Sequence, residues 1–284
     1  MEENFSLDFI IEKFLGEGAY GSVYLVKDKK SSKSYAVKFI PYDPDKKSKI
    51  LSEVNIANKV HSPYIVKYYG LYDSLRFING KTDRYYLLPM DYIPGVTLDK
   101  FIQHLVHLND LEYQRVILLL MKQVFTGIRD LHDAGIAHRD IKEQNILVDK
   151  NNQVHIIDLG LACNLKGLFG RKCLANMGSF IYTPLEVHNS SRSISGKIAY
   201  RHDIWAAGVM FFHIITGEFP YYGDNEEEFL NNLKKNKLNA HLPSWTRYLN
   251  QIIDHALSLD WKDRPDADEM VKMIDEELEK FLPL

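Results

Sequence analysis

The sequence predicts an α+β protein with a strand-rich first part and a mainly helical second part. Runs of β-branched and aromatic residues bounded by turn residues occur before residue 93, at about 10–16, 22–27, 34–40, 65–73 and 85–90. Beyond residue 94, apolar residues recur with helical spacing, most clearly at 110–135, 203–215 and 266–281. No repeat or linker interrupts the chain, so we place one boundary, near residue 93.

Two local signals complete the first part. Asp43-Pro44 has the form of an N-cap followed by proline at the first helical position, which predicts a helix that continues to about Val60. Asn79-Gly80 is typical of a tight hairpin between two strands. We therefore expect five strands and one helix in this part.

The composition excludes several classes of protein. The 284 residues are 45% hydrophobic and 26% charged, as in a globular protein with a core. Lys and Arg number 35 against 38 Asp and Glu, so no basic field favours nucleic-acid binding. No run approaches the roughly 18 apolar residues of a membrane span, and residues 1–8 lack an apolar signal segment. We expect a cytoplasmic protein, with too few cysteines for a disulfide scaffold and no histidine spacing typical of zinc enzymes.

The first motif is the glycine-rich run 16–21, Gly-Glu-Gly-Ala-Tyr-Gly. Such glycines let backbone N–H groups approach a polyphosphate. Dinucleotide-binding folds share this spacing, but there a helix must follow directly. Here Val23 opens a β-branched run, so we expect a strand-loop-strand flap over phosphates.

Two charged residues stand in apolar surroundings. Lys38 is the only lysine in the run 34–40, where its ammonium is costly unless it meets an anion. Glu53 shares a helical turn with apolar residues, and Lys38 is its obvious partner. The alternatives are a lysine that reaches solvent from a strand edge and a solvated glutamate.

The central stretch is 138–145, His-Arg-Asp-Ile-Lys-Glu-Gln-Asn, followed by Asp158-Leu159-Gly160. It supplies one base, one cation and two oxygen ligands, which is the inventory of a phosphoryl-transfer site. Magnesium prefers hard oxygen donors and takes only one or two from the protein, which suits Asn145 and Asp158. Asp140 is then free to orient an attacking hydroxyl.

These segments resemble, in order and spacing, the motifs of the protein kinase family. The resemblance covers about residues 9–280 and implies a bilobal fold. The N-lobe, 9–93, would hold a five-stranded antiparallel sheet and one helix, and the C-lobe, 94–281, would be mainly α-helical. The implied reaction moves the γ-phosphate of ATP to Ser or Thr hydroxyls of protein substrates.

The resemblance also implies roles for individual residues. Asp140, Lys142, Lys38 and Glu53 would be catalytic, and Asn145 and Asp158 would hold Mg²⁺. The residues expected to contact ATP are Leu15, Gly16, Glu17, Gly18, Ala19, Tyr20, Gly21, Val23, Ala36, Lys38, Met90, Asp91, Ile93 and Leu147. Pro89 departs from the family pattern and predicts a bulge or an edge position beside the hinge.

Other family features match in part. Lys142 follows the Ser/Thr-kinase pattern, Ser179 stands at the usual Thr position, and 61–69 is most similar to the STE or MAP-kinase-kinase branch. Pro184-Leu185 replaces Ala-Pro before Glu186. The family implies that Arg264 pairs with Glu186 and that Asp203 holds the catalytic-loop backbone.

The segment between Asp158 and Gly178 contains no Ser, Thr or Tyr. Arg139, which pairs with a phosphate in many kinases, would lack that ligand. We hypothesise that activation needs no phosphate in this segment. Its order would come from a regulatory protein or from packing of the apolar residues Leu165, Leu168, Phe169 and Leu174.

Cys163 and Cys173 lie in the same segment. They could form a redox switch, but we expect reduced, inert thiols, because the cytosol keeps thiols reduced. The acidic run 224–228 could attract a basic substrate, but we expect it to complement a helix dipole.

Three alternatives differ in function. A pseudokinase scaffold usually lacks one of Lys38, Asp140 and Asp158, and all three are present. A small-molecule phosphotransferase would lack the set Glu186, Asp203 and Arg264. A dual-specificity kinase remains open, and the sequence reveals neither the substrate nor the regulator.

Overall fold

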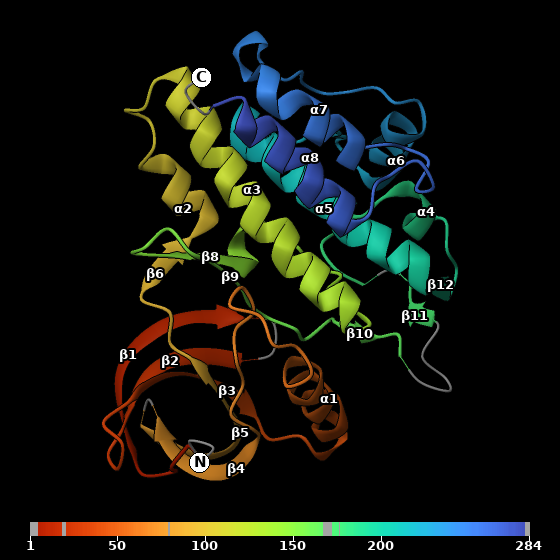
Figure 1. The fold of residues 1–284 in the computed structure, drawn as a ribbon. Coiled ribbons are helices and arrows are strands. Elements are labelled where there is room, and N and C mark those ends of the chain that lie inside the picture. The colour runs from red at the N-terminus through yellow and green to blue at the C-terminus, as the bar shows by residue number, and fades with distance from the viewer. Residues whose placement is uncertain (1–4, 19–20, 79, 167–171, 176, 282–284) are drawn as a thin grey trace. The chain divides into compact units, whose positions relative to one another are not determined.

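The computed structural model describes residues 5–18, 21–78, 80–166, 172–175 and 177–281. The chain forms two compact units (Figure 1). The first holds the residues up to 61 together with 65–94, and the second holds 62–64 and the chain from 95 onward.

The first unit contains a five-stranded antiparallel sheet in the order β1-β2-β3-β5-β4, red to orange in Figure 1. Its strands are β1 (Phe9–Gly18), β2 (Gly21–Asp28), β3 (Ser34–Pro41), β4 (Tyr72–Ile78) and β5 (Lys81–Asp91). The predicted five-stranded sheet is therefore confirmed. The predicted turn closes β4 and β5 at Gly80, while Asn79 lies outside the described residues.

The helix of this unit, α1 (Lys47–Ala57), follows a 3₁₀ turn at Pro44–Lys46. Asp43 is the N-cap, as predicted, and its side chain accepts a hydrogen bond from the amide of Asp45 at 3.1 Å. The prediction that the helix reaches Val60 is wrong. The amides of Lys59 and Val60 bond to carbonyls three residues back, which tightens the chain out of the α-helix.

One strand prediction needs correction, and the one for Pro89 can be narrowed. Residues 65–71 form no ladder: Tyr68 makes one isolated bridge with Met90, and Gly70, with φ +107°, precedes β4. Of the two alternatives predicted for Pro89, the edge position is confirmed and the bulge is not, because β5 pairs with β3 without a shift of register. The β4 ladder ends at Tyr72 and Leu87, so the missing N–H of Pro89 costs that ladder nothing.

An aromatic cluster forms part of the core of the first unit. Its buried members are Phe5, Val26, Tyr35, Val37, Phe39 and Leu87. Phe5 is only 4% exposed and packs edge-on against Tyr35, with ring centroids 5.3 Å apart. Phe5 had no role predicted from the sequence.

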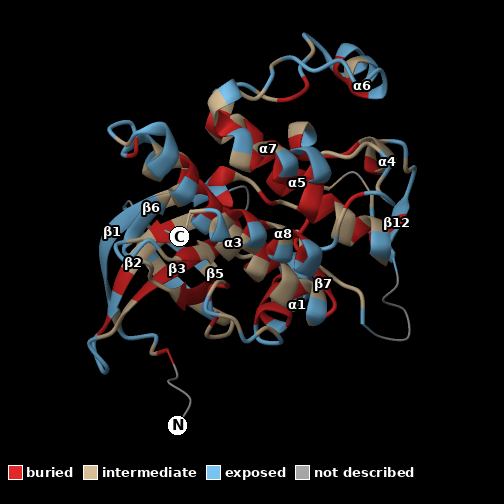
Figure 2. Cartoon of the chain, turned by 45° about the horizontal axis from the view of Figure 1, so that its top comes forward, coloured by how far each residue is buried: buried red, intermediate tan, exposed pale blue. Residues whose placement is uncertain are grey.

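The second unit is mainly helical. Its helices are α2 (Leu98–Gln103), α3 (Asp110–Asp133), α4 (Leu185–His188), α5 (Gly196–Thr216), α6 (Glu226–Lys234), α7 (Arg247–Ala256) and α8 (Ala267–Glu279). Buried residues, red in Figure 2, run along α3 and line nearly every side of α5. The predicted helix at 203–215 begins earlier, because the Ser195 hydroxyl caps it by accepting from the amide of Ile198.

Short strands of the second unit frame the loops that carry the motifs. They are β6 (Gly95–Thr97), β7 (Ile136–Ala137), β8 (Ile146–Asp149), β9 (Val154–Ile156), β10 (Cys163–Asn164), β11 (Lys172–Leu174) and β12 (Ser193–Ser195). The strands β6, β8 and β9 form one sheet, β7 pairs with β10, and β11 pairs with β12. The catalytic stretch thus runs from β7 to β8, and Asp158 follows β9.

The acidic run lies where a helix dipole favours it. Asn225 caps α6, and Glu226, Glu227 and Glu228 occupy the first turn, as predicted. Within the described residues, no helix combines the length and apolar character that crossing a membrane requires.

Candidate active site

The glycine-rich run forms the β1–β2 hairpin, in which Gly18 pairs with Gly21. A Cβ on Gly21 would lie 2.1 Å from the carbonyl oxygen of Phe39, so the close approach of β3 requires glycine there. Among the described residues, nothing lies within 4 Å of a Cβ on Gly16, and the nearest atom at Gly18 is 3.6 Å away. Gly16 therefore borders open space, whereas a Cβ on Gly18 would lie in van der Waals contact with its neighbours. Ala19 and Tyr20 lie outside the described residues.

Lys38 and Glu53 are both buried, with 5% and 7% exposure, so neither is a solvated surface charge. Lys38 lies on β3, and its Cε is 3.9 Å from a Cβ built on Gly18. Glu53 lies on the buried face of α1 and accepts a hydrogen bond from the Tyr68 hydroxyl at 3.1 Å. The ion pair between Lys38 and Glu53 stays a prediction.

The predicted hinge lies at the end of β5. Met90 is 9% exposed and pairs across the sheet with Ala36. The Asp91 amide donates to the carbonyl of Lys67 at 3.0 Å, and its carboxylate accepts from the Tyr69 hydroxyl at 2.6 Å. Burial and this bond raise the pKa of Tyr69 to about 12.

The other expected nucleotide contacts differ in exposure. Leu15 and Glu17 are exposed on β1, whereas Val23 on β2 and Ile93 are half-buried. Leu147 belongs to the second unit, where it lies on β8 opposite Thr97 and His155.

The catalytic loop is held by Asp203, which is fully buried on α5. Its carboxylate accepts from the amides of His138 at 2.8 Å and Arg139 at 2.7 Å, and contacts His132 Nε2 at 2.8 Å. Arg139 has φ +69°, a strained conformation that these two bonds hold in place. The predicted role of Asp203 in holding this backbone is confirmed.

Asp140 is the most highly connected carboxylate of the loop. Its oxygens accept from Lys142 Nζ at 2.8 Å, the Ser179 hydroxyl at 2.9 Å and Asn145 Nδ2 at 3.0 Å. Burial alone would raise the pKa of Asp140, but the hydrogen bond and charge of Lys142, with the Ser179 hydroxyl, hold it below its usual range. Asp140 is therefore ionised at neutral pH and can accept a proton.

Lys142 bridges Asp140 to Ser179. Its Nζ lies 2.8 Å from Asp140 Oδ2 and donates to the Ser179 hydroxyl at 2.9 Å. The amide of Ser179 also donates to Asp140, at 3.1 Å. Ser179 thus connects the segment after Gly178 to Asp140 and Lys142 of the catalytic loop.

Asn145 and Asp158 provide oxygen donors of the kind that magnesium prefers. Asn145 Nδ2 donates to the carbonyl of Asp140 at 2.7 Å as well as to its carboxylate, which leaves the amide oxygen as the atom for a cation. The Asn145 carbonyl accepts from the amide of Ile157 at 2.9 Å, next to Asp158, which has φ +62°. One amide oxygen and one carboxylate fit an ion that takes its other ligands from phosphates and water.

Sequence reasoning gave no role to Glu143, which is 1% exposed. Its carboxylate accepts from the Tyr182 hydroxyl and lies 2.8 Å from His213 Nδ1. The ring of His213 stacks on Phe219, with centroids 4.1 Å apart. These partners lie 39 and 70 residues further along the chain, so no local pattern signals them.

A buried ion pair anchors the segment after the site. The guanidinium of Arg264 lies 2.8 Å from Glu186 Oε1 and also donates to the carbonyls of Arg201 and Ser258. The predicted pair is confirmed, although Pro184-Leu185 replaces the usual Ala-Pro. Pro184 stands at the N-cap of α4, so the exchange leaves the helix start intact.

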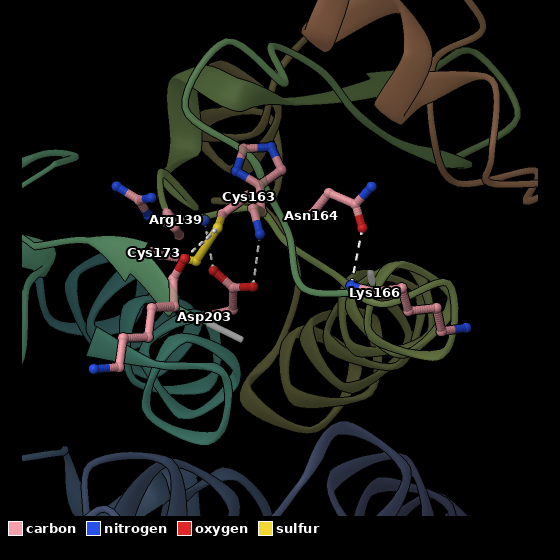
Figure 3. The surroundings of a disulfide bond; sticks show 8 residues. Arg139, Cys163, Asn164, Lys166, Cys173 and Asp203 are labelled. Carbon is pink, nitrogen blue, oxygen red and sulfur yellow. Dashed lines mark hydrogen bonds between the residues drawn. A yellow bond between two sulfur atoms is a disulfide. The ribbon is translucent and has the colours of Figure 1, made fainter. Parts of the chain in front are cut away.

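The expectation of reduced thiols is wrong, because Cys163 and Cys173 form a disulfide with a Cα–Cα distance of 6.0 Å (Figure 3). The two strands that carry them place their side chains together, which spacing alone could not show. Leu165 packs against the cluster that contains Cys173, as expected. Leu174 is 68% exposed, so its packing role is wrong, and Leu168 and Phe169 lie outside the described residues.

Several known proteins are similar to this chain in sequence. A MAP kinase kinase of Saccharomyces cerevisiae is 27% identical over 274 residues, which cover 90% of this chain and 51% of that protein. A calcium-dependent protein kinase of Plasmodium berghei is 28% identical over 250 residues, 85% of this chain and 44% of that protein. The serine/threonine-protein kinase pakH of Dictyostelium discoideum is 32% identical over 213 residues, 75% of this chain and 38% of that protein.

The chain spans about half the length of the curated relatives it matches. The family model described as "Protein kinase domain" matches residues 9–274. This match covers nearly the whole chain, and the five-stranded sheet, the helical second unit and the buried Asp203 and Arg264 contacts agree with it. The chain therefore belongs to the protein kinase family.

Proposed function

We propose that this chain is an ATP- and Mg²⁺-dependent kinase that phosphorylates Ser and Thr residues of proteins. One observation carries the proposal: Asp140, Lys142, Asn145 and Ser179 meet within hydrogen-bond distance in one loop cluster. Protein kinases need a base, a cation and an oxygen-rich metal site, and little covalent chemistry from the protein.

Asp140 is the base. The Ser179 hydroxyl donates to Asp140 Oδ1 at 2.9 Å, which is the contact that a substrate hydroxyl needs in order to lose its proton. Lys142, 2.8 Å from the same carboxylate, provides positive charge where negative charge grows on the transferred phosphoryl group.

Asn145 and Asp158 would hold Mg²⁺, which supplies charge neutralisation at the phosphates. In the first unit, the open space at Gly16 supports phosphate binding by the hairpin. Lys38, whose Cε lies 3.9 Å from a Cβ built on Gly18, would contact the α and β groups. We assign 9–93 to the N-lobe and 94–281 to the C-lobe of one kinase domain. The reaction belongs in the cytoplasm, where ATP and Mg²⁺ are plentiful.

The choice of Ser and Thr rests on Lys142 and Ser179. Both face Asp140, and both occupy the positions that Ser/Thr kinases use. The named relatives include Ser/Thr kinases and a MAP kinase kinase, in keeping with a weak similarity to the STE branch. We further infer activity without phosphorylation between 158 and 178, where the composition offers no acceptor.

The test is phosphoryl transfer from radiolabelled ATP with Mg²⁺ to a generic basic protein, followed by phosphoamino acid analysis. Wild-type protein expressed without other kinases should label Ser and Thr, and Asp140→Asn should lower kcat by about 10²–10⁴-fold. Nucleotide binding without transfer would indicate a pseudokinase scaffold. Phosphotyrosine would indicate dual specificity, and transfer only to small molecules would reject a protein substrate.

A further inference from the structure

The Cys163–Cys173 disulfide joins two strands with different neighbours. Cys163 on β10 pairs with Ala137 on β7, which leads directly into the catalytic loop. Cys173 on β11 pairs with Ile194 on β12, which leads into α5 and its Asp203. The disulfide therefore links β10, which pairs with the strand before the catalytic loop, to β11, which pairs with the strand before α5.

The two sulfur atoms differ in access. Cys173 is 2% exposed and belongs to a cluster with Ala137, Val187, Ile194 and Ala199. Cys163 is half-buried, so a small thiol or disulfide can reach its sulfur. A bond with one accessible sulfur can be opened and closed without unfolding of the core.

Arg139 lies among the residues that surround the disulfide (Figure 3). It is 5% exposed, and its Nη2 has no hydrogen-bond partner among the described residues. In kinases this cation commonly orders the segment by binding a phosphate, but residues 159–178 contain no hydroxyl to carry one. A nearby guanidinium also stabilises a cysteine thiolate, the form that reacts.

We propose that Cys163 and Cys173 form a reversible redox site. Its disulfide stabilises the conformation of the chain between Asp158 and Gly178, a role that a bound phosphate has in other kinases. The oxidant is a low-molecular-weight disulfide such as oxidised glutathione, and the reductant is a dithiol. The effect on activity rests on the proposed kinase function. The disulfide form is the active one, since in it Ser179 contacts Asp140 and Lys142.

The chemistry is thiol–disulfide exchange. The Cys163 thiolate attacks one sulfur of the oxidant, whose S–S bond breaks and releases one thiolate. The Cys173 thiolate then attacks the Cys163 sulfur of the mixed disulfide and releases the second thiolate. Two electrons pass from the cysteines to the oxidant, and the two cysteine protons end on the released thiols.

The loss of the bond should loosen the segment. Two strand pairings would remain. The pairing of β7 with β10 involves only two residues on each strand, and that of β11 with β12 only three. The disulfide closes a loop between residues that are 10 positions apart. Closing this loop lowers the conformational entropy of its disordered states. Ser179 lies a few residues beyond Cys173, so the contacts around Asp140 should weaken with it.

The first experiment measures the bond itself. The chain has two cysteines, so differential alkylation and mass spectrometry report on this pair alone. The native protein is equilibrated with mixtures of reduced and oxidised glutathione. A Cys163–Cys173 cross-link that forms and is reversed by dithiothreitol supports the proposal. No cross-link at any ratio, or one that opens only in denaturant, would overturn it.

The second experiment measures activity on a peptide across the same mixtures. Reduction should lower kcat/KM by roughly tenfold, mainly through a higher KM for the peptide, because the segment loses its closure. The variant Cys163→Ser/Cys173→Ser should match the reduced wild type and ignore the redox mixture. Equal activity of oxidised and reduced wild type would sink the idea, and this comparison needs no variant.

A third measurement separates this proposal from the kinase assignment. If neither redox form transfers phosphate, the proposed function fails. Amide hydrogen exchange of the two redox forms then tests the redox site without any activity. Faster exchange of the described residues 159–166 and 172–175 in the reduced form, with α5 unchanged, supports the proposal. Identical exchange in both forms rejects it.

Discussion

Glu143 is a buried carboxylate that ties the catalytic loop to two distant segments. It accepts from the Tyr182 hydroxyl, and it lies 2.8 Å from His213 Nδ1 on α5. Tyr182 follows Ser179 closely, so Glu143 positions the segment that meets Asp140. Burial, and then the charge of Glu143, raise the pKa of the Tyr182 hydroxyl, which keeps it a donor at all ordinary pH.

We expect Glu143→Gln to raise the KM for a peptide by about three- to tenfold while kcat changes less, because a hydrogen bond to a charged group is replaced by a neutral one. The amide keeps the shape of the carboxylate, so the fold should survive. Steady-state kinetics at varied peptide concentration and saturating ATP separate the effect on KM from the effect on kcat.

Glu276→Gln is the matched control for Glu143→Gln, because Glu276 is exposed on α8. It should leave both kinetic constants unchanged. A peptide KM equal to that of the wild type in Glu143→Gln would show that the buried carboxylate does not position the segment. An equal rise of the peptide KM in both variants would point to the change of net charge instead.

The sequence predicted residues whose partners lie nearby in a motif and missed those whose partners lie far away. Asp140, Lys142 and Asn145 lie within six positions of one another, and the structure joins them by hydrogen bonds. Asp203 and Arg264 could be placed only by resemblance to a family. Glu143 had neither signal, because its partners come from 39 and 70 residues away.

At the scale of the element, the β1–β2 hairpin contains glycines with different tasks. Gly21 is enclosed, since a Cβ there would lie 2.1 Å from the Phe39 carbonyl oxygen. Gly16 is open, since no described atom lies within 4 Å of such a Cβ. The fold of the sheet therefore demands glycine at 21 but not at 16.

Gly21→Ala should lower the free energy of unfolding by about 2 kcal/mol or more, because β2 or β3 must move to relieve the contact with a backbone atom. Gly16→Ala should change it by less than about 0.5 kcal/mol, since the added methyl meets open space. Urea unfolding followed by circular dichroism measures both. Equal losses in the two variants would contradict this division of tasks.

Elements were predictable where local pattern and tertiary contacts agree. The strands β1, β2 and β3 and the helices α3 and α8 have strong periodicity or caps, including the Asp266 capping box of α8. Residues 65–71 look strand-like but form no ladder: the Tyr69 amide donates to the carbonyl of Pro89 and the Asp91 amide to that of Lys67, which makes the one bridge between Tyr68 and Met90. The choice between ladder and single bridge depends on β5, which a local pattern does not contain.

At the scale of the whole chain, the least predictable feature was the disulfide. Two cysteines ten positions apart carry no signal of pairing, and the expected compartment argued against it. Only the placement of β10 beside β7 and of β11 beside β12 brings the two side chains together. Pairing of short strands is a tertiary outcome, which explains why sequence reasoning favoured reduced thiols.

The second unit also buries several ionisable groups around α5. Asp203, His202 and Arg264 are each at most 2% exposed. Burial lowers the pKa of His202 to about 4, although Asp203 favours its charged form, and Arg139, Arg264 and His188 oppose protonation. His202 is therefore a neutral core residue whose protonation the fold resists.

This burial predicts a dependence of stability on pH. The unfolded chain binds a proton at His202 near pH 6.5, whereas the folded chain binds it only near pH 4. The contribution of His202 to stability is therefore constant above pH 6.5 and is lost as the pH falls toward 4. The loss should reach about 3 kcal/mol, at about 1.4 kcal/mol per pKa unit.

We expect His202→Gln to remove this slope, since glutamine binds no proton, whatever the variant costs at neutral pH. The measurement is the free energy of unfolding in urea at intervals from pH 7.5 to 4.5, taken as the difference between variant and wild type, so that all other titrating groups cancel. The difference should shrink steadily below pH 6.5. His241→Gln, at an exposed position, is the matched control. Parallel curves for His202→Gln and the wild type would mean that His202 takes up its proton equally well in the folded chain, and that α5 tolerates a charge in its core.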